Sequence, residues 1–305
     1  MIGEIAKNIN ILGDFCGKRD VWELSHENLN KKYGFEKADV MVLFGGSIIV
    51  GGDVLAKAMK EEIAKTYVIV GGAGHTTETL RQKVHEEYPD IETAGLCEAE
   101  VFDRYLIHNY GIQADYLETG STNCGNNITY LLELLDQNHI SWNSIILCQD
   151  ATMQNRMDAG FRKYAPGKII INYAAYFAEV IQKDEKLCYA KEIHGMWSLE
   201  RYVNLLMGEI PRLTDNEEGY GPKGKDFIAH VEVPRKCGLK SNSLMESLNL
   251  LNTDSAEDKD LIYKVKKYRK VRNNIVHNNK NVEKEEAEDI ISCIEKLCES
   301  ITGGK

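Results

Sequence analysis

Residues 145–156, with the sequence IILCQDATMQNR, decide the expected fold of this chain. The apolar run at residues 145–148 stops at Gln149 and the carboxylate of Asp150, and a polar turn then leads into a stretch with helical character. In an open α/β sheet, ligands bind in the crevice beyond the carboxyl ends of the strands. The stretch therefore predicts a strand, a turn and a helix, with a ligand site at the turn.

The same change from an apolar run to a small polar turn occurs at three other places. They are FGGS at residues 44–47, GGAGH at residues 71–75 and ETGSTNCG at residues 118–125. Because the carboxyl ends of parallel strands meet at one edge of a sheet, these strand ends together predict one shared site.

Strand and helix patterns alternate through this part of the chain. Strands are expected at residues 40–44, 67–70, 114–117, 144–148 and 168–172, and helices at residues 53–65, 76–88, 98–108, 126–138 and 154–164. This alternation predicts an α/β fold with a Rossmann-like parallel sheet and helices on both faces, since the crossovers are right-handed.

Three regions are expected along the sequence. Residues 1–35 have a helical pattern, and residues 36–240 form the Rossmann-like domain, with an extra helix near residues 197–207. Residues 241–305 are rich in Lys, Glu, Asn and Leu and predict a C-terminal helical appendage with helices at residues 244–251, 261–277 and 283–301.

Composition limits the possible functions. The formal net charge of -10 argues against general electrostatic capture of nucleic acid, although a local basic patch remains possible. No signal-peptide core or run of about 20 apolar residues is evident, which predicts no membrane partner. The 8 cysteines form no CxxC pair, so we expect reduced thiols in a cytoplasmic protein and no metal site. The oligomeric state is open.

Glycine and small polar residues at the strand ends let the backbone approach a ligand closely, although tight turns also need glycine. The spacing is neither GxGxxG nor GxxxxGK[ST], so ordinary dinucleotide binding is unsupported and a P-loop is excluded. A helix that begins near Thr76 would present free amides to an anion. The residues expected to contact the ligand here are Gly45, Gly46, Ser47, Gly71, Gly72 and Gly74.

Titratable residues at the strand ends are the candidates for chemistry. We expect His75 and Asp150 to act as acid or base, and Glu118 or Asp150 to accept hydrogen bonds from ribose hydroxyls or an amine. The alternative for each is a purely structural role in satisfying turn or helix amides. Cys124 near a helix start is a nucleophile or, more simply, a structural thiol, and Arg156 either faces the site or pairs with an acid such as Asp158.

Several motifs in register carry a resemblance to a known family. They are GGAGHTT at residues 71–77, STNCGNN at residues 121–127, QDATMQNR at residues 149–156, WSLERY at residues 197–202, GEIPRL at residues 208–213 and GYGPKGKDF at residues 219–227. Over residues 36–234 the chain resembles the YdcF branch of the YdcF/SanA-like family.

The resemblance implies a Rossmann-like sheet with extra helices, an activity that is not resolved, and S-adenosyl-L-methionine as a possible cofactor. It implies a pocket lined by Gly45, Gly72, His75, Glu98, Glu118, Ser121, Asn123, Asn127 and Asp150. Two positions depart from the family pattern. Asn126 replaces a glutamate, which removes a charge from the expected site, and Ala151 replaces a proline.

A second class of function is suggested near the C-terminus. Arg272 and His277, in the stretch RNNIVH, resemble the Arg-x4-His motif of HEPN-type domains, many of which are metal-independent ribonucleases. An arginine could bind phosphate while the histidine transfers a proton. A basic helix is also often only a solvated face.

The sequence thus favours a small-molecule ligand containing a nucleoside, with S-adenosyl-L-methionine as the leading candidate. Whether the protein is an enzyme, such as a transferase or hydrolase, or only a binding module remains open. The alternative is a protein that cleaves or binds RNA through its C-terminal helices.

Overall fold

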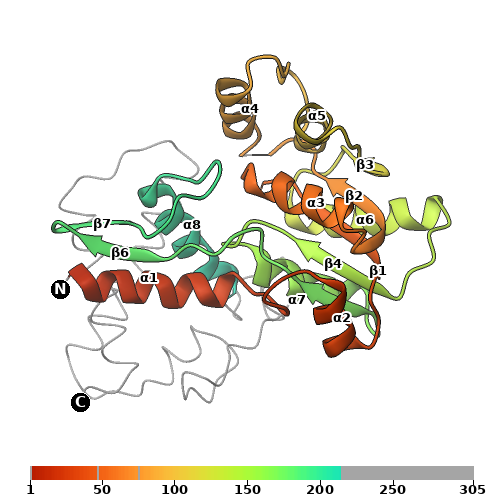
Figure 1. Ribbon diagram of the computed structural model, residues 1–305, viewed down its shortest axis with the longest axis horizontal. Helices are drawn as coiled ribbons and strands as arrows, with labels where there is room; N and C mark the ends of the chain where they lie inside the picture. Colours follow the sequence, from red (N-terminus) through yellow and green to blue (C-terminus); the bar gives the residue numbers. More distant parts are fainter. Residues whose placement is uncertain (1, 47, 75, 214–305) are drawn as a thin grey trace. The chain divides into compact units, whose positions relative to one another are not determined.

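The computed structural model describes residues 2–46, 48–74 and 76–213, which include a five-stranded parallel sheet (Figure 1). Its strand order is β3-β2-β1-β4-β5. The strands are β1 (Ala38–Phe44), β2 (Ala64–Val70), β3 (Tyr116–Glu118), β4 (Ser144–Cys148) and β5 (Ile169–Asn172). The predicted α/β Rossmann-like architecture is therefore confirmed.

The strand order reverses at the centre of the sheet. The chain runs outward from β1 through β2 to β3, then returns to pair β4 with the other side of β1. Leu43 of β1 lies opposite Cys148 of β4, so the turns that follow these two strands are neighbours. This reversal is the switch point at which open α/β sheets bind ligands.

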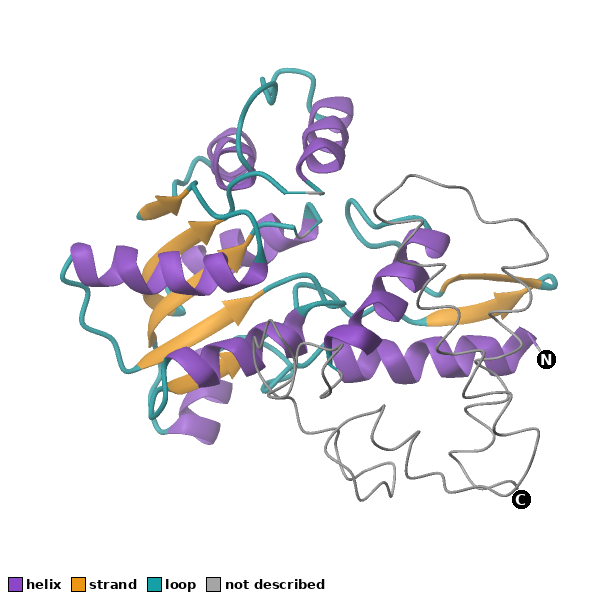
Figure 2. Cartoon of the chain, turned by 180° about the vertical axis from the view of Figure 1, so that it is seen from behind, coloured by secondary structure: helices purple, strands orange, loops and turns teal. Residues whose placement is uncertain are grey.

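Helices cover both faces of the sheet (Figure 2). Helix α3 (Val50–Lys60) packs on β1 and β2, and α5 (Glu98–Tyr110) packs on β2 and β3, with α4 (Thr77–Glu87) against α5. Helices α6 (Cys124–Gln137) and α7 (Gln154–Tyr164) cover the other face.

One hydrophobic core lies between the sheet and the pair α6 and α7. Val40, Val42 and Phe44 of β1 are fully buried there against Ile128 of α6 and Phe161 of α7. Side chains alternate across a strand, so Met41 and Leu43, also fully buried, belong to the opposite face. A strand that is apolar on both faces is typical of the centre of a parallel sheet.

The N-terminal segment is only partly helical. Helices α1 (Ile2–Cys16) and α2 (His26–Tyr33) are present, but residues 17–25 are not helical, so the helical prediction for residues 1–35 is wrong there. The reason is tertiary pairing. The Asp20 amide donates to the Asn172 carbonyl at 2.8 Å, and the Asn172 amide donates to Asp20 Oδ2 at 2.7 Å.

One other expectation needs correction, and one element was not predicted. The helix predicted over residues 53–65 begins at Val50 and ends at Lys60, because Glu62 has a φ of 51° and Ala64 already pairs with Ala38 in the sheet. An antiparallel hairpin of β6 (Val180–Lys183) and β7 (Lys186–Tyr189), not predicted, follows the sheet.

The described chain falls into two compact units. One comprises residues 13–179 and 191–202 and contains the sheet, and the other comprises residues 2–12, 180–190 and 203–213. In the second unit, the Asn10 side chain donates to the Val180 carbonyl at 2.9 Å and accepts from the Val180 amide at 2.7 Å, which ties α1 to the hairpin. The helix predicted near residues 197–207 is α8 (Leu199–Arg212), which belongs to both units.

The predicted boundaries at residues 35 and 240 stay predictions, and the three helices expected after residue 241 lie outside the described residues. Within the described ranges, no helix has both the length and the apolar character that crossing a bilayer requires.

Candidate functional site

The glycines that follow β1 and β2 pack against one buried carboxylate. A Cβ at Gly45 would lie 2.3 Å from Glu98 Oε2 and 3.0 Å from the Gly71 Cα. A Cβ at Gly71 would lie 3.0 Å from the Glu98 Cβ. Only glycine fits at both positions. Glycine is therefore needed here at least partly because the backbone packs against Glu98.

Glu98 begins α5 and organises the two turns. Its Oε1 accepts hydrogen bonds from the hydroxyls of Thr76 and Thr77, both at 2.9 Å, and the Gly46 amide also donates to its carboxylate. The Glu98 amide donates to the Gly72 carbonyl at 2.9 Å. Burial raises the pKa of the Glu98 carboxyl, while the hydrogen bonds act to lower it.

The turn after β2 also meets the turn after β3. The Gly72 amide donates to Ser121 Oγ at 3.2 Å, and a Cβ at Gly72 would lie 2.2 Å from the Ser121 carbonyl oxygen. The Gly71 amide donates to the Glu118 carbonyl at 2.9 Å. Three strand ends are thus joined through backbone contacts, as the sequence predicted for one edge of the sheet.

Glu118 has one satisfied and one unsatisfied carboxylate oxygen. Its Oε1 accepts from the amides of Gly120 at 2.6 Å and Ser121 at 2.9 Å, which is the structural role weighed above. Its Oε2 is buried and receives no hydrogen bond from the described residues. The residue is 7% exposed, and a buried acceptor without a donor costs roughly 1–3 kcal/mol. Among the described residues of this edge, Glu118 therefore has a buried acceptor that no protein donor satisfies.

The loop after β3 ends at the start of α6. Asn123 caps this helix, since its side chain accepts from the Asn126 amide at 3.0 Å, and asparagine is among the residue types favoured at this position. Asn127 lies in the first turn and is buried. Gly74, in the turn after β2, donates its amide to Thr77 Oγ1 at 2.7 Å, at the start of α4.

Asp150, at the end of β4, is almost completely buried, and both its oxygens accept hydrogen bonds. Oδ1 accepts from the Thr152 amide at 2.9 Å, the Thr152 hydroxyl at 2.7 Å and the Tyr176 hydroxyl at 2.9 Å. Oδ2 accepts from the Trp197 indole at 2.9 Å. Burial raises the pKa of the Asp150 carboxyl against the lowering effect of these donors. Asp150 therefore joins three segments, and its role as an acid or base stays a prediction.

Gln149 connects Asp150 to the glycine turns, a role that the sequence did not reveal. Its Oε1 accepts from the Asp150 amide at 2.6 Å, and its Nε2 donates to the Gly45 carbonyl at 3.3 Å. Gln149, Tyr176 and Trp197 were all missed, because a side chain's partner in another segment leaves no local pattern.

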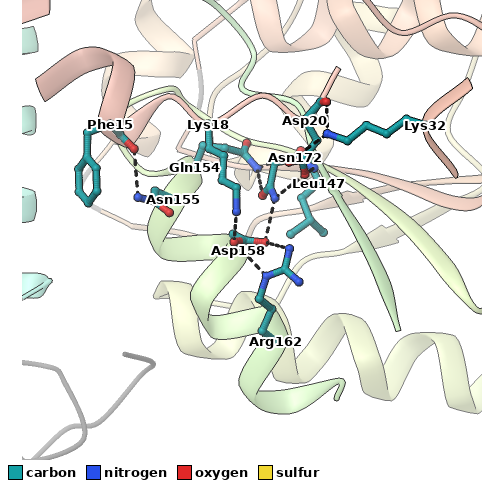
Figure 3. Close-up of polar contacts among 10 residues, drawn as sticks. All are labelled: Phe15, Lys18, Asp20, Lys32, Leu147, Gln154, Asn155, Asp158, Arg162 and Asn172. Atoms are coloured by element: carbon teal, nitrogen blue, oxygen red, sulfur yellow. Dashed lines mark hydrogen bonds and ion pairs between the residues drawn. The ribbon is translucent and has the colours of Figure 1, made fainter. Parts of the chain in front are cut away.

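Arg156 and Cys124 meet between α7 and α6. Arg156 Nη1 lies 2.7 Å from Cys124 Sγ, and both residues are buried. Asp158, the other partner considered for Arg156, is bound by different residues (Figure 3). Lys18 Nζ lies 2.6 Å from Asp158 Oδ2, Arg162 Nη2 lies 2.9 Å from Oδ1, and the Asn172 side-chain amide donates to Oδ1 at 2.8 Å. This cluster fastens the N-terminal segment to α7 and β5.

Ser47 and His75 lie outside the described residues, and so do Arg272 and His277. The residues that the structure joins by direct contacts are Gly45, Gly46, Gly71, Gly72, Glu98, Glu118 and Ser121, with Asp150 linked through Gln149.

No model of a known protein family matches this sequence. Its resemblance to the YdcF branch, and that of its C-terminal stretch to HEPN-type domains, therefore stay predictions.

Proposed function

We propose that this protein binds a nucleoside-containing small molecule at the carboxyl edge of the sheet, with S-adenosyl-L-methionine as the leading candidate. The strand order β3-β2-β1-β4-β5 supports this location, because β1 and β4 form the switch point at which such folds bind ligands. A cytoplasmic location is part of the proposal, supported by 8 cysteines without a CxxC pair.

The observation that carries the proposal is the unsatisfied Oε2 of Glu118. Its other oxygen holds the turn at Gly120 and Ser121, so the side chain is fixed in place before any ligand arrives. A buried carboxylate oxygen without a donor among the described residues favours a ligand that supplies one. A ribose hydroxyl or an amino group supplies that donor.

S-adenosyl-L-methionine fits this residue set chemically. It carries ribose hydroxyls, an amino group and a positively charged sulfonium, all of which favour a carboxylate neighbour. Glu118 would accept from the ribose, and the closely packed glycine turns at Gly45 and Gly72 would lie beside the rest of the molecule. When bound as a cofactor it supplies an activated alkyl group for transfer.

Binding is better supported than catalysis by Asp150. Each of its oxygens already accepts a hydrogen bond, and to act as a base the carboxylate would have to release a donor such as Trp197 or Tyr176. Glu118 Oε2, by contrast, has no donor among the described residues to release.

Isothermal titration with S-adenosyl-L-methionine tests the proposal, using the wild type, Glu118→Gln and the exposed control Glu133→Gln. The amide of Glu118→Gln keeps one acceptor for the turn and replaces the other with a donor. We expect saturable binding that weakens about tenfold or more in Glu118→Gln, since a hydrogen bond to a charged group contributes about 1.5–3 kcal/mol.

Adenosine, methionine and S-adenosylhomocysteine identify the part of the ligand that is recognised. Binding of adenosine but not methionine agrees with recognition of the nucleoside. If no nucleoside gives saturable heat with the wild type, or if Glu118→Gln binds as tightly as Glu133→Gln, the proposal is wrong.

A further inference from the structure

His194 lies between two carboxylates that belong to different helices. Its Nδ1 lies 2.6 Å from Asp53 Oδ2 on α3, and its Nε2 lies 2.7 Å from Glu87 Oε1 at the end of α4. Asp53 also accepts hydrogen bonds from the hydroxyls of Tyr105 and Tyr110 through its Oδ1, which fixes the orientation of its carboxylate.

This geometry requires a charged imidazole. A neutral imidazole has one N–H, so one of its two nitrogens would present a lone pair to a carboxylate oxygen. Only the imidazolium donates to both carboxylates at once. The two carboxylates also raise the pKa of His194 above its ordinary value of 6.5, against the opposing effect of burial.

The turn that follows His194 lies against the start of α3 and against α4. The His194 carbonyl accepts from the Val50 amide at 3.2 Å, and Lys83 donates to the carbonyls of Gly195 at 2.7 Å and Met196 at 2.5 Å. Gly195 has a φ of 70°, and a Cβ there would lie 2.9 Å from the Ile49 side chain.

The same turn leads directly to Trp197, whose indole donates to Asp150 at 2.9 Å. The position of Trp197 therefore depends on how firmly residues 194–196 are held. The His194 pair of contacts is the part of this attachment that changes with protonation near neutral pH.

We propose that residues 193–197 form a pH-sensitive clasp. Protonated His194 binds Asp53 and Glu87 and holds Trp197 on Asp150, and loss of the proton releases one carboxylate and loosens the turn. The clasp is a property of the protein alone and does not depend on the ligand proposed above.

Each carboxylate also has a hydroxyl partner, since Tyr105 and Tyr110 donate to Asp53 Oδ1 and a side-chain hydrogen bond joins Tyr88 to Glu87. His194 differs from these hydroxyls because it bridges the two carboxylates. Lys83 of α4 is directed to the carbonyls of the turn, and Tyr88 and Tyr105 present their rings to the imidazole at centroid distances of 6.4 and 6.2 Å. The titratable and charged groups that surround the clasp are Asp53, Lys83, Glu86, Glu87, Tyr88, Tyr105, His108 and Tyr110.

Trp197 fluorescence in the full chain tests the clasp. Trp22→Phe and Trp142→Phe together leave Trp197 as the sole indole, and its emission is followed from about pH 6 to about pH 8. We expect a reversible change with a midpoint above 6.5, the ordinary value for histidine. His194→Gln should abolish the step, since an amide carries one donor and one acceptor at every pH.

Two further variants make the result decisive. Glu87→Gln, at a half-exposed side chain, should move the midpoint to lower pH without removing it. His139→Asn is the control, because this exposed histidine has a φ of 55°, which asparagine tolerates, and the midpoint should not change. A step that persists in His194→Gln, an unchanged midpoint in Glu87→Gln, or no step in the background protein overturns the proposal.

Discussion

The indole Nε1 of Trp197 donates a hydrogen bond of 2.9 Å to Oδ2 of Asp150, a residue 47 positions earlier in the chain. Trp197 itself is 4% exposed and Asp150 is 1% exposed. The end of β4 is thereby fixed by a side chain from the segment that precedes α8. A buried carboxylate of this kind depends on its donors, and their removal has a measurable effect on stability.

Trp197→Phe should therefore lower the free energy of unfolding by about 1–3 kcal/mol, because it leaves Asp150 Oδ2 without this donor. Urea denaturation measures the change. The control Trp22→Phe, at a residue that is 83% exposed, should stay within about 0.5 kcal/mol of the wild type. Equal effects of the two substitutions would contradict the structural role of the Trp197–Asp150 contact.

Gly72→Ala tests the backbone contact between the turns after β2 and β3. The added Cβ would lie 2.2 Å from the Ser121 carbonyl oxygen, so the turns must separate, and we expect a loss of about 1–3 kcal/mol or more. Gly74→Ala in the same turn is the matched control, since its Cβ would find its nearest neighbour, the Thr122 carbonyl oxygen, 3.8 Å away. Similar thermal unfolding of both variants would show that the turns are not packed as described.

Asp158→Asn should destabilise the protein at neutral pH by about 1–3 kcal/mol, because the buried Asp158 loses charged hydrogen bonds whose partners, Lys18 and Arg162, are themselves partly exposed. Burial acts to raise the pKa of the Asp158 carboxyl, but hydrogen bonds from Arg162, Lys18 and Asn172 lower it overall. A group with a lowered folded pKa stabilises the protein above its unfolded pKa and loses this effect as pH falls.

The stability difference between wild type and Asp158→Asn should therefore be fully present at neutral pH and shrink on acidification below 3.8, the ordinary pKa of the group. Urea denaturation at several pH values measures it. A difference that grows on acidification would mean that Asp158 is not held as an anion by Lys18 and Arg162.

His194→Gln should have the opposite pH dependence. The pKa of His194 is raised, so its contribution is fully present below 6.5, the ordinary value, and is lost as pH rises through the folded pKa. We expect a loss of about 1 kcal/mol at the acidic end, the scale of a partly exposed charged hydrogen bond. If the loss is instead largest at alkaline pH, His194 is not bound as the imidazolium.

Local patterns in the sequence were sufficient for much of the sheet. The bounds of β4 (Ser144–Cys148) and α7 (Gln154–Tyr164) agree with the prediction, because an abrupt change from apolar to polar residues marks both. The hairpin of β6 and β7 was missed. Its turn places Asp184 and Glu185 at φ values of 49° and 60°, conformations that are usually signalled by glycine or asparagine.

The candidate site was predicted less completely than the fold. Glycine-rich strand ends revealed where the turns meet, since a close approach of two backbones requires glycine and is therefore visible in the local sequence. The sequence did not reveal which side chains donate to Asp150, because Tyr176 and Trp197 come from distant segments with no periodic relation to it. The role of Glu98 in filling the space beside Gly45 and Gly71 is likewise a property of packing, which a single sequence does not encode locally.

The most direct test of the central claim is to locate a bound ligand by nuclear magnetic resonance. Addition of S-adenosyl-L-methionine to isotope-labelled protein should shift the backbone amide signals of Gly120 and Ser121, which donate to Glu118, and of Gly72, which donates to Ser121. The signals of α2, whose Asn28 amide is held by Ser25, should not change. Shifts confined to residues away from the carboxyl edge of the sheet, or no shifts at saturating ligand, would contradict the account.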